Sequence, residues 1–249
     1  MILHSSNSFP KILHQELINT KINNLLREIH PDFIHTNPIL SGSYLIKLAV
    51  SPNSDYNDYD FYFETEQDFK KAFELLKSKY FSPKKTKNSF SFFSTSDSLS
   101  SIQLITKTFA PPADILNCHD FQNSQIAWSK DGIYFSTGFR SSWKEKTLNL
   151  SSNQLPDFSE KAQWLAKVVV LLGRINKYIL RYDLNLSSQF KELLKIILQS
   201  IQTNENAFRS FDFAFLNSFD FDYHSTIQLP NKINSIFELK ETILALIED

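Results

Sequence analysis

Two short segments of the sequence combine residue types that suit phosphate and metal chemistry. Asp58 and Asp60 stand two positions apart in a stretch that alternates polar and aromatic residues and is typical of a β-strand. Carboxylates at positions i and i+2 of a strand project from the same face, close enough to share one or two Mg2+ ions. Upstream, Ser41-Gly42-Ser43 predicts a turn whose backbone N–H groups and hydroxyl could bind the phosphates that such metals neutralise.

This combination is the minimum that two-metal nucleotidyl transfer requires. One metal ion activates the incoming hydroxyl, and the other holds the triphosphate. The same residues also allow an interpretation without chemistry, in which the two aspartates form a solvated strand face and Gly42 only lets the chain turn.

The elements around these segments alternate between helix and strand up to about residue 150. We expect a helix over 11–29, a short strand over 33–36, a helix that Thr65 caps and that ends near Tyr80, strands over 89–95 and 101–107, a short helix over 111–117 and a hairpin over 125–136. Beyond the loop at 151–156 the pattern is mostly helical, at roughly 158–182, 187–202 and 233–248. The sequence therefore predicts an α+β protein, with a mixed-sheet domain over 1–150 and a helical domain over 151–249.

Several segments, in this order, resemble the nucleotidyltransferase fold of the polymerase-β-like superfamily, whose signature is a G-[GS] turn followed by a strand with D-x-[DE]. The sequence is most similar to the head of CCA-adding enzymes and bacterial poly(A) polymerases. Ile102–Phe109 is similar to their E-V-x-T-F-R strand, His119–Trp128 to their R-R-D-F-T-I-N-A-L-A-Y segment, and Leu171–Leu184 to their L-R-x-x-R-x-x-x-x-L-G-F helix. The likeness covers about residues 38–190.

The resemblance implies a reaction and a set of residues for it. A nucleoside monophosphate would pass from an NTP to a hydroxyl acceptor. The first candidate for this acceptor is an RNA 3′ end, and the next candidates are a protein side chain or a small molecule. Asp58 and Asp60 would hold Mg2+ or Mn2+, and Gly42 and Ser43 would bind the β- and γ-phosphates. Asp120 is a further candidate for a metal or ribose contact.

The sequence also departs from the family pattern. Cys118-His119 replaces the basic pair before Asp120, and Gln103 replaces a strand glutamate. The nucleotide-selecting E-D-x-x-R helix is not recognisable, and the chain ends near the point where a tRNA-holding body would continue. These departures favour a smaller relative, of the toxin or phage type, over CCA addition itself.

Basic side chains could bind the triphosphate or an RNA end. Arg174 and Lys177 share a helix face, Arg140 follows the predicted hairpin, and Lys47 stands one turn after the Gly-Ser loop. The alternative is a solvated helix face whose aliphatic stems pack on the protein.

Composition excludes several other classes. With 26 Lys+Arg and 27 Asp+Glu the net charge is -1, which argues against a broad non-specific nucleic-acid surface. The six histidines show no metal-ligand spacing, and Cys118 is the single cysteine, which favours a reducing compartment. The N-terminus resembles no export signal and no apolar run is long enough for a membrane span, so we expect a cytoplasmic protein that does not contact a membrane.

Three hypotheses follow. The first is an active nucleotidyltransferase with an NTP, an RNA acceptor and a possible protein partner or antitoxin. The second is a catalytically lapsed member that binds nucleotide or RNA or acts as a scaffold, which Gln103 favours and the retained aspartates oppose. The third is a phage or host structural protein that shares only the fold.

Overall fold

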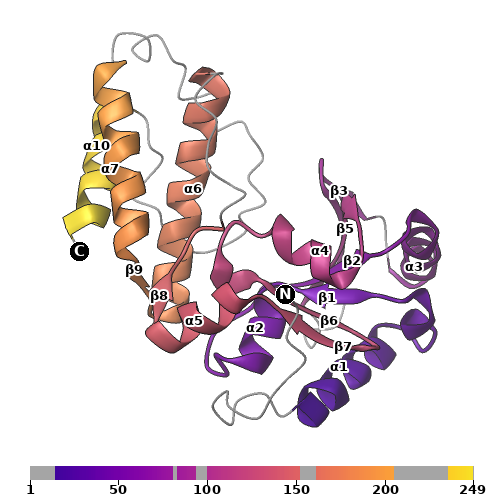
Figure 1. The fold of residues 1–249 in the computed structure, drawn as a ribbon. Helices are drawn as coiled ribbons and strands as arrows, with labels where there is room; N and C mark the ends of the chain where they lie inside the picture. The colour runs from indigo at the N-terminus through magenta and orange to yellow at the C-terminus, as the bar shows by residue number, and fades with distance from the viewer. Residues whose placement is uncertain (1–14, 81–82, 94–99, 152–160, 205–234, 249) are drawn as a thin grey trace. The chain divides into compact units, whose positions relative to one another are not determined.

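A computed structural model describes residues 15–80, 83–93, 100–151, 161–204 and 235–248 (Figure 1). The chain divides into two compact units, Met1–Trp143 and Lys144–Asp249. The predicted boundary in the loop at 151–156 lies outside the described residues from 152 onwards, and so do positions 11–14 of the first predicted helix. No helix in the described part of the chain is long and apolar enough to cross a membrane.

The first unit interleaves helices and strands. Its elements are α1 (Gln15–Ile29), η1 (Phe33–Thr36), β1 (Ile39–Ser41), α2 (Ser43–Ala49), β2 (Asp58–Phe63), α3 (Glu66–Lys79), β3 (Lys84–Lys85), β4 (Ser89–Phe92), β5 (Ser101–Phe109), α4 (Pro112–Ile115), η2 (Leu116–Cys118), η3 (Gln122–Ser124), β6 (Ile126–Ser129) and β7 (Gly132–Phe135). Helix α5 (Thr137–Glu145) then runs across the boundary between the units.

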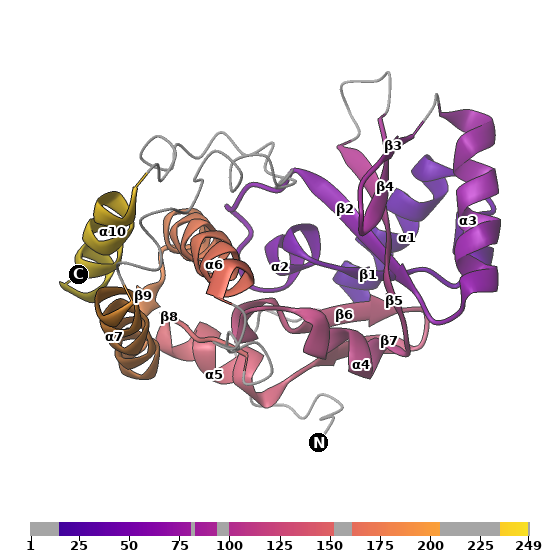
Figure 2. The same ribbon diagram turned by 90° about the horizontal axis from the view of Figure 1, so that it is seen from above.

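The strands form one seven-stranded sheet in the order β3-β4-β5-β2-β1-β6-β7. Strands β2 and β5 are parallel, and the other neighbours are antiparallel, so the sheet is mixed. Helices α1 and α2 lie on one side of β1 and β6, and α4 lies on the other side (Figures 1 and 2). The predicted α+β class with a mixed sheet is confirmed.

Strand β2 is the central element of this sheet because its alternation separates two faces. Tyr59, Phe61 and Phe63 are buried, whereas the residues between them are half-buried. The Phe61 ring meets Phe33 of η1 edge to face at 5.0 Å between centroids, and Phe63 meets Phe69 of α3 at 5.9 Å. The aromatic positions of the alternating segment therefore anchor the strand and leave its polar positions on the opposite face.

Helix α3 begins as the sequence predicts. The Thr65 hydroxyl accepts a hydrogen bond from the Asp68 N–H at 3.1 Å and donates one to Asp68 Oδ2 at 2.8 Å. At its other end, the Lys79 ammonium donates to the carbonyls of Glu28 and Ile29, which lie at the C-terminus of α1. Helix α3 thus supplies a donor to carbonyls at the end of α1 that have no donor within their own helix.

One local prediction is wrong, and one further helix has no counterpart among the predicted elements. Residues 33–36, expected as a strand, form the 3-10 turn η1, which the Thr36 hydroxyl closes on the Phe33 carbonyl at 2.7 Å and which ends at Asn37 in a left-handed conformation. Helix α5 was not expected after the hairpin. Its first turn is capped by the Ser136 hydroxyl, which accepts from the Phe139 N–H at 2.9 Å, and its residues Phe139 and Trp143 are buried.

The second unit is mostly helical, as predicted. Its elements are β8 (Thr147–Leu148), α6 (Lys161–Tyr182), β9 (Asn185–Leu186), α7 (Ser188–Thr203) and α10 (Ile236–Glu248). Strands β8 and β9 pair in parallel, and the Ser187 hydroxyl caps α7 by accepting from the Phe190 N–H at 3.2 Å. Leu194, Ile201 and Leu239 are among the fully buried residues of this unit.

Phe61→Ala tests whether the buried face of β2 holds the first unit together. The Phe61 side chain is fully buried, so we expect a loss of about 3–5 kcal/mol in the free energy of unfolding, measured by urea denaturation. Phe93→Ala is the control because that ring is 51% exposed, and its loss should stay below about 0.5 kcal/mol. Equal losses for the two variants would contradict the assignment.

Candidate functional site

The site centres on the half-buried face of β2. Asp58 and Asp60 are the first and third residues of the strand and point to the same side, as their spacing predicts. Asp58 Oδ1 accepts a hydrogen bond from the Ser101 hydroxyl on the neighbouring parallel strand β5. Two carboxylates therefore stand next to one another on a rigid strand, and a hydroxyl orients one of them.

The Ser-Gly-Ser turn meets this strand at Asp60. Ser41, the last residue of β1, pairs in register with Asp60, and Gly42 follows with φ +82° before α2 begins at Ser43. A Cβ atom on Gly42 would overlap Asp60 Oδ2. Glycine is therefore required here by its backbone conformation and also by the close approach of the carboxylate.

The position beside Asp60 on β5 is occupied by a neutral amide. Gln103 pairs in register with Asp60, just as Ser101 pairs with Asp58. This places Gln103 at the point where a third carboxylate would join the pair. Within the residues that the structure describes, no group of three or more His, Cys, Asp or Glu side chains is arranged to hold a metal ion.

The two carboxylates form an oxygen donor set that suits Mg2+. That ion is commonly held by one or two carboxylates and completes its shell with water and substrate phosphates. The Gly42 turn lies beside Asp60, so phosphates bound at the turn would be adjacent to such an ion. Asp58 and Asp60 can thus contribute part of a shell whose other ligands come from a nucleotide.

His119 is a site residue that the sequence indicated only as a departure from the family pattern. Its Nε2 lies 2.8 Å from Ser41 Oγ, and that hydroxyl donates its single proton to the Ile126 carbonyl at 2.6 Å. His119 Nε2 must therefore be the donor in its bond to Ser41, which fixes the proton on that nitrogen. The imidazole also meets the Tyr62 ring at 6.2 Å, so the loop with Asp120 reaches the same face of β1 and β2.

Three tyrosines support the loop that precedes β2. The hydroxyls of Tyr56 and Tyr59 lie 3.1 Å apart, and the Tyr44 ring contacts both of their rings, with centroids 4.7 and 4.8 Å away. Burial, followed by the neighbouring Tyr56 and Glu28, raises the pKa of Tyr44 to about 12. Burial also raises the pKa of Tyr59. The cluster keeps the chain compact immediately before Asp58.

The predicted cationic residues fall into different parts of the structure. The Lys47 ammonium lies over the Tyr56 ring at 5.2 Å from its centroid, against the tyrosine cluster. Arg140 lies on α5, and Arg174 and Lys177 lie on α6 in the second unit. Nucleotide binding by these residues and by Ser43, and the role of Asp120, remain predictions.

Two kinds of contact were beyond the sequence. The Ser101 contact depends on the parallel pairing of β2 with β5, and nothing in either segment specifies that register. His119 bonds to Ser41, which lies 78 positions away in the chain. The sequence around Cys118 and His119 shows no helical or strand periodicity from which the direction of the His119 side chain could be predicted. The family pattern at 119–120 was the one signal that pointed to this loop.

Comparison of the sequence with protein families identifies a family that covers the mixed-sheet part of the chain. Residues 16–146, just over half of the chain, match a family described as "Gabija anti-defense 2 family protein". No curated protein matches the sequence.

Comparison of the structure with solved structures gives similar folds at low sequence identity. A CCA-adding enzyme in complex with ATP is 16% identical, with a TM-score of 0.55 over 80% of this chain and 48% of that one. The Thermotoga maritima CCA-adding enzyme complexed with tRNA is 15% identical, with a TM-score of 0.52 over 78% and 47% of the two chains. The chain thus spans about half the length of these enzymes. The nucleotidyltransferase fold expected from the sequence is confirmed.

Gly42→Ala tests the close approach to Asp60. We expect the free energy of unfolding to fall by more than the roughly 1–3 kcal/mol of a strained backbone, because the new Cβ also displaces the carboxylate. Gly132→Ala is the matched control: it has φ +149°, but the nearest atom to its Cβ is Gln15 Nε2 at 3.9 Å.

A double-mutant cycle in urea denaturation isolates the clash. Gly42→Ala should cost less in an Asp60→Ala background, where the obstructing carboxylate is gone. Equal costs in both backgrounds would show that the carboxylate does not constrain the turn.

The tyrosine cluster predicts loss of stability at alkaline pH. The pKa of Tyr44 is about 12 in the folded protein against an ordinary value of 10.0, so between these values the folded state keeps a proton that the unfolded state loses. This contribution to stability is complete below pH 10 and is lost as the pH rises towards 12. Tyr44→Phe should flatten the decline in urea midpoint between pH 10 and 12, and an unchanged profile would contradict this prediction.

Proposed function

The chain belongs to the Gabija anti-defense 2 family, and from its fold and site we propose that it is a metal-dependent nucleotidyltransferase. It would transfer a nucleoside monophosphate from an NTP to a hydroxyl acceptor, with an RNA 3′ end as the first candidate. The observation that carries this proposal is the contact of the Gly42 turn with Asp60, one of two carboxylates on the same strand face.

In the proposed reaction the acceptor oxygen forms a bond to the α-phosphorus, and the bond from that phosphorus to the β-phosphate oxygen breaks. Pyrophosphate leaves, and the acceptor proton is released. Asp58 and Asp60 would hold Mg2+ or Mn2+, which would supply charge neutralisation of the phosphates and a lower pKa for the attacking hydroxyl. The Ser101 hydrogen bond would fix the orientation of the Asp58 carboxylate.

The remaining predicted residues have supporting roles in this proposal. Gly42 and Ser43 would place the β- and γ-phosphates at the end of β1, next to Asp60. Arg140, Arg174 and Lys177 are proposed to neutralise the triphosphate. Lys47 is proposed for the same task, and to perform it the ammonium would have to leave the Tyr56 ring.

Asp120 follows His119, whose bond to Ser41 brings this loop to the turn. We propose that its carboxylate contacts the ribose or the metal.

The family description supports a biological setting. We propose that the protein acts in the cytoplasm of a bacterial host and opposes the Gabija defence by modifying a component on which that defence depends. RNA is the leading acceptor, since the solved structures of similar fold include an enzyme complexed with tRNA. A protein partner or an antitoxin remains a further prediction.

A specific observation favours the second candidate, a lapsed enzyme that only binds nucleotide or RNA. Gln103 occupies the register position beside Asp60 and cannot act as a third anionic ligand. In this alternative a titration with Mn2+ would show no binding that depends on Asp58 or Asp60, with or without NTP.

A labelling assay tests the proposed activity. The purified protein with Mg2+ or Mn2+ is given each α-labelled NTP in turn, with total RNA and cell extract as acceptors. We expect label in an RNA band, and a loss of roughly 100-fold or more in Asp58→Asn and Asp60→Asn, which keep the side-chain shape but remove the charge. Asp131→Asn is the matched control, because Asp131 is an exposed aspartate on the β6–β7 turn.

The outcomes separate the hypotheses. Label in protein would keep the activity but replace the acceptor. Absence of label with every nucleotide, from protein that is folded and supplied with both acceptor classes, would overturn the enzyme proposal.

A further inference from the structure

The register of the sheet places a continuous row of residues on the face that carries the two aspartates. From the edge of the sheet inwards, the row pairs Lys84 of β3 with Ser91 of β4, Ser91 with Gln103 of β5, and Gln103 with Asp60 of β2. Residues directly opposite one another in a sheet point to the same face. Because neighbouring strands lie about 4.8 Å apart, this row extends roughly 14 Å from Asp60 to the edge of the sheet.

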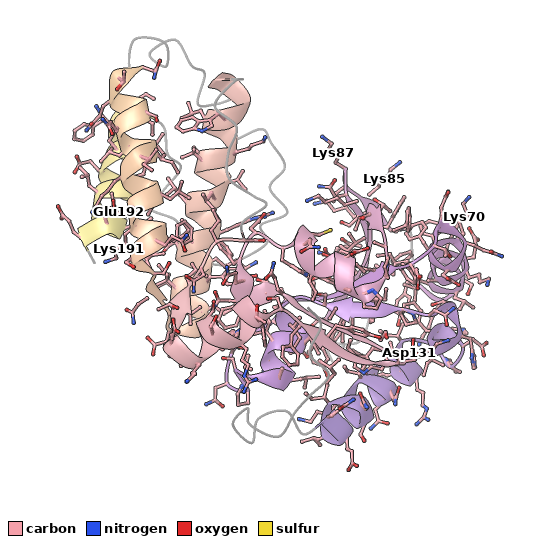
Figure 3. All side chains as sticks on the ribbon, in the orientation of Figure 1. Lys70, Lys85, Lys87, Asp131, Lys191 and Glu192 are labelled. Atoms are coloured by element: carbon pink, nitrogen blue, oxygen red, sulfur yellow. The ribbon has the colours of Figure 1, made fainter. Side chains whose placement is uncertain are left out.

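Lys84 and Lys85 are adjacent in sequence but occupy opposite faces of β3. The Lys85 ammonium lies over the Phe90 ring at 5.5 Å from its centroid, and Phe90 packs on Phe73 of α3. Lys84 therefore belongs to the face of Asp60, and its side chain is exposed. Figure 3 shows Lys85 and Lys87 at this edge of the sheet, and both are exposed.

An exposed aromatic ring completes the same region. Phe92, the last residue of β4, pairs in register with Ile102; Phe93 follows Phe92 in the chain, and Ser101, which binds Asp58, precedes Ile102. Phe93 is 51% exposed, whereas the preceding Phe92 is fully buried. A large apolar ring thus stands in solvent one strand away from the residue that orients a proposed metal ligand.

We propose that Lys84, Phe93 and Gln103, here called the acceptor strip, bind the unpaired 3′ end of a single-stranded RNA, with the buried Ser91 between Lys84 and Gln103 in the row. The role of the strip as an acceptor site rests on the proposed transfer at Asp58 and Asp60. The terminal base stacks on Phe93, the Lys84 ammonium binds a backbone phosphate, and the Gln103 amide offers both a donor and an acceptor to a base or ribose edge.

The chemistry of the strip matches single-stranded nucleic acid in two ways. Aromatic stacking tolerates every base, and a nearby cation follows the backbone, which is the usual combination in proteins that bind single strands. The amide at Gln103 matters as much as the cation, because a carboxylate there would repel a phosphodiester beside Asp60. The residue that weakens the metal site therefore makes the neighbouring surface more favourable for RNA.

A binding assay without nucleotide or metal tests the strip independently of catalysis. The full chain is titrated into a 5′-fluorescein-labelled single-stranded RNA octamer, and anisotropy gives the dissociation constant at several salt concentrations. Phe93→Ala should weaken binding about 5- to 140-fold, the range expected for the loss of one stacked base. Phe93→Tyr should retain binding, and Phe237→Ala, at a ring 67% exposed in the second unit, is the matched control.

The salt dependence separates the contribution of the cation. Lys84→Ala should reduce the slope of log K against log salt by about 0.7, the value for one phosphate contact with a single strand. Lys85→Ala removes the same charge from the opposite face of the same strand and should leave the slope unchanged. A blunt RNA duplex of the same length should bind more weakly than the single strand, because its terminal bases are already stacked.

Two results would overturn the inference. One is that the wild-type protein fails to bind the RNA octamer at low salt, and the other is that Phe93→Ala and Lys84→Ala leave binding intact. If RNA binding depends on both residues but no NTP supports transfer, the strip is confirmed and the proposed activity fails. If transfer is observed and labels a protein while the RNA octamer does not bind, the activity is confirmed and the strip is overturned.

Discussion

The close approach of Gly42 to the Asp60 carboxylate is the constraint on which the rest of the site depends. The antiparallel register of β1 and β2 sets Ser41 opposite Asp60, and the next residue must then turn with a positive φ beside the carboxylate. A side chain at that point would separate the turn from the strand. The chain has 4 glycines in 249 residues, and one of them occupies this position. A phosphate bound at the turn would therefore lie next to a cation bound at the strand.

The distribution of charge around the aspartates follows from the same geometry. Two carboxylates on one face repel each other, which raises the free energy of the doubly ionised pair. The Ser101 hydroxyl donates a hydrogen bond to Asp58, and the neutral Gln103 avoids a third negative charge beside Asp60. A cation held by this pair must take more of its ligands from the nucleotide. In the proposed enzyme, metal binding and NTP binding are consequently coupled.

Local chemistry determined how much the sequence could predict. The strand β2 and its two faces follow from strict alternation of polar and aromatic residues. The cap of α3 follows from the threonine at position 65, which stands three residues before Asp68. The relation between β2 and β5 could not be predicted, because parallel strands are joined by long connections and their register depends on the packing of α3 and the intervening hairpin. For the same reason the Ser101–Asp58 bond and the row from Lys84 to Asp60 emerged only from the structure.

The helix α2 illustrates the other limit of spacing arguments. Lys47 was predicted to bind phosphate because it stands one turn beyond the Gly-Ser loop, yet its ammonium lies over Tyr56. Tyr56 packs on Tyr59, whose side chain points to the face of β2 opposite Asp60. Proximity in sequence to the turn therefore does not by itself place a side chain on the face of Asp60.

Lys84, in contrast, lies on a strand whose register places it on the face of Asp60. The period of a strand is two, so a shift of one residue in β3 would exchange Lys84 with Lys85 and remove the positive charge from the row of Asp60. The register of a two-residue edge strand therefore decides whether this face of the sheet can bind a polyanion next to its two carboxylates.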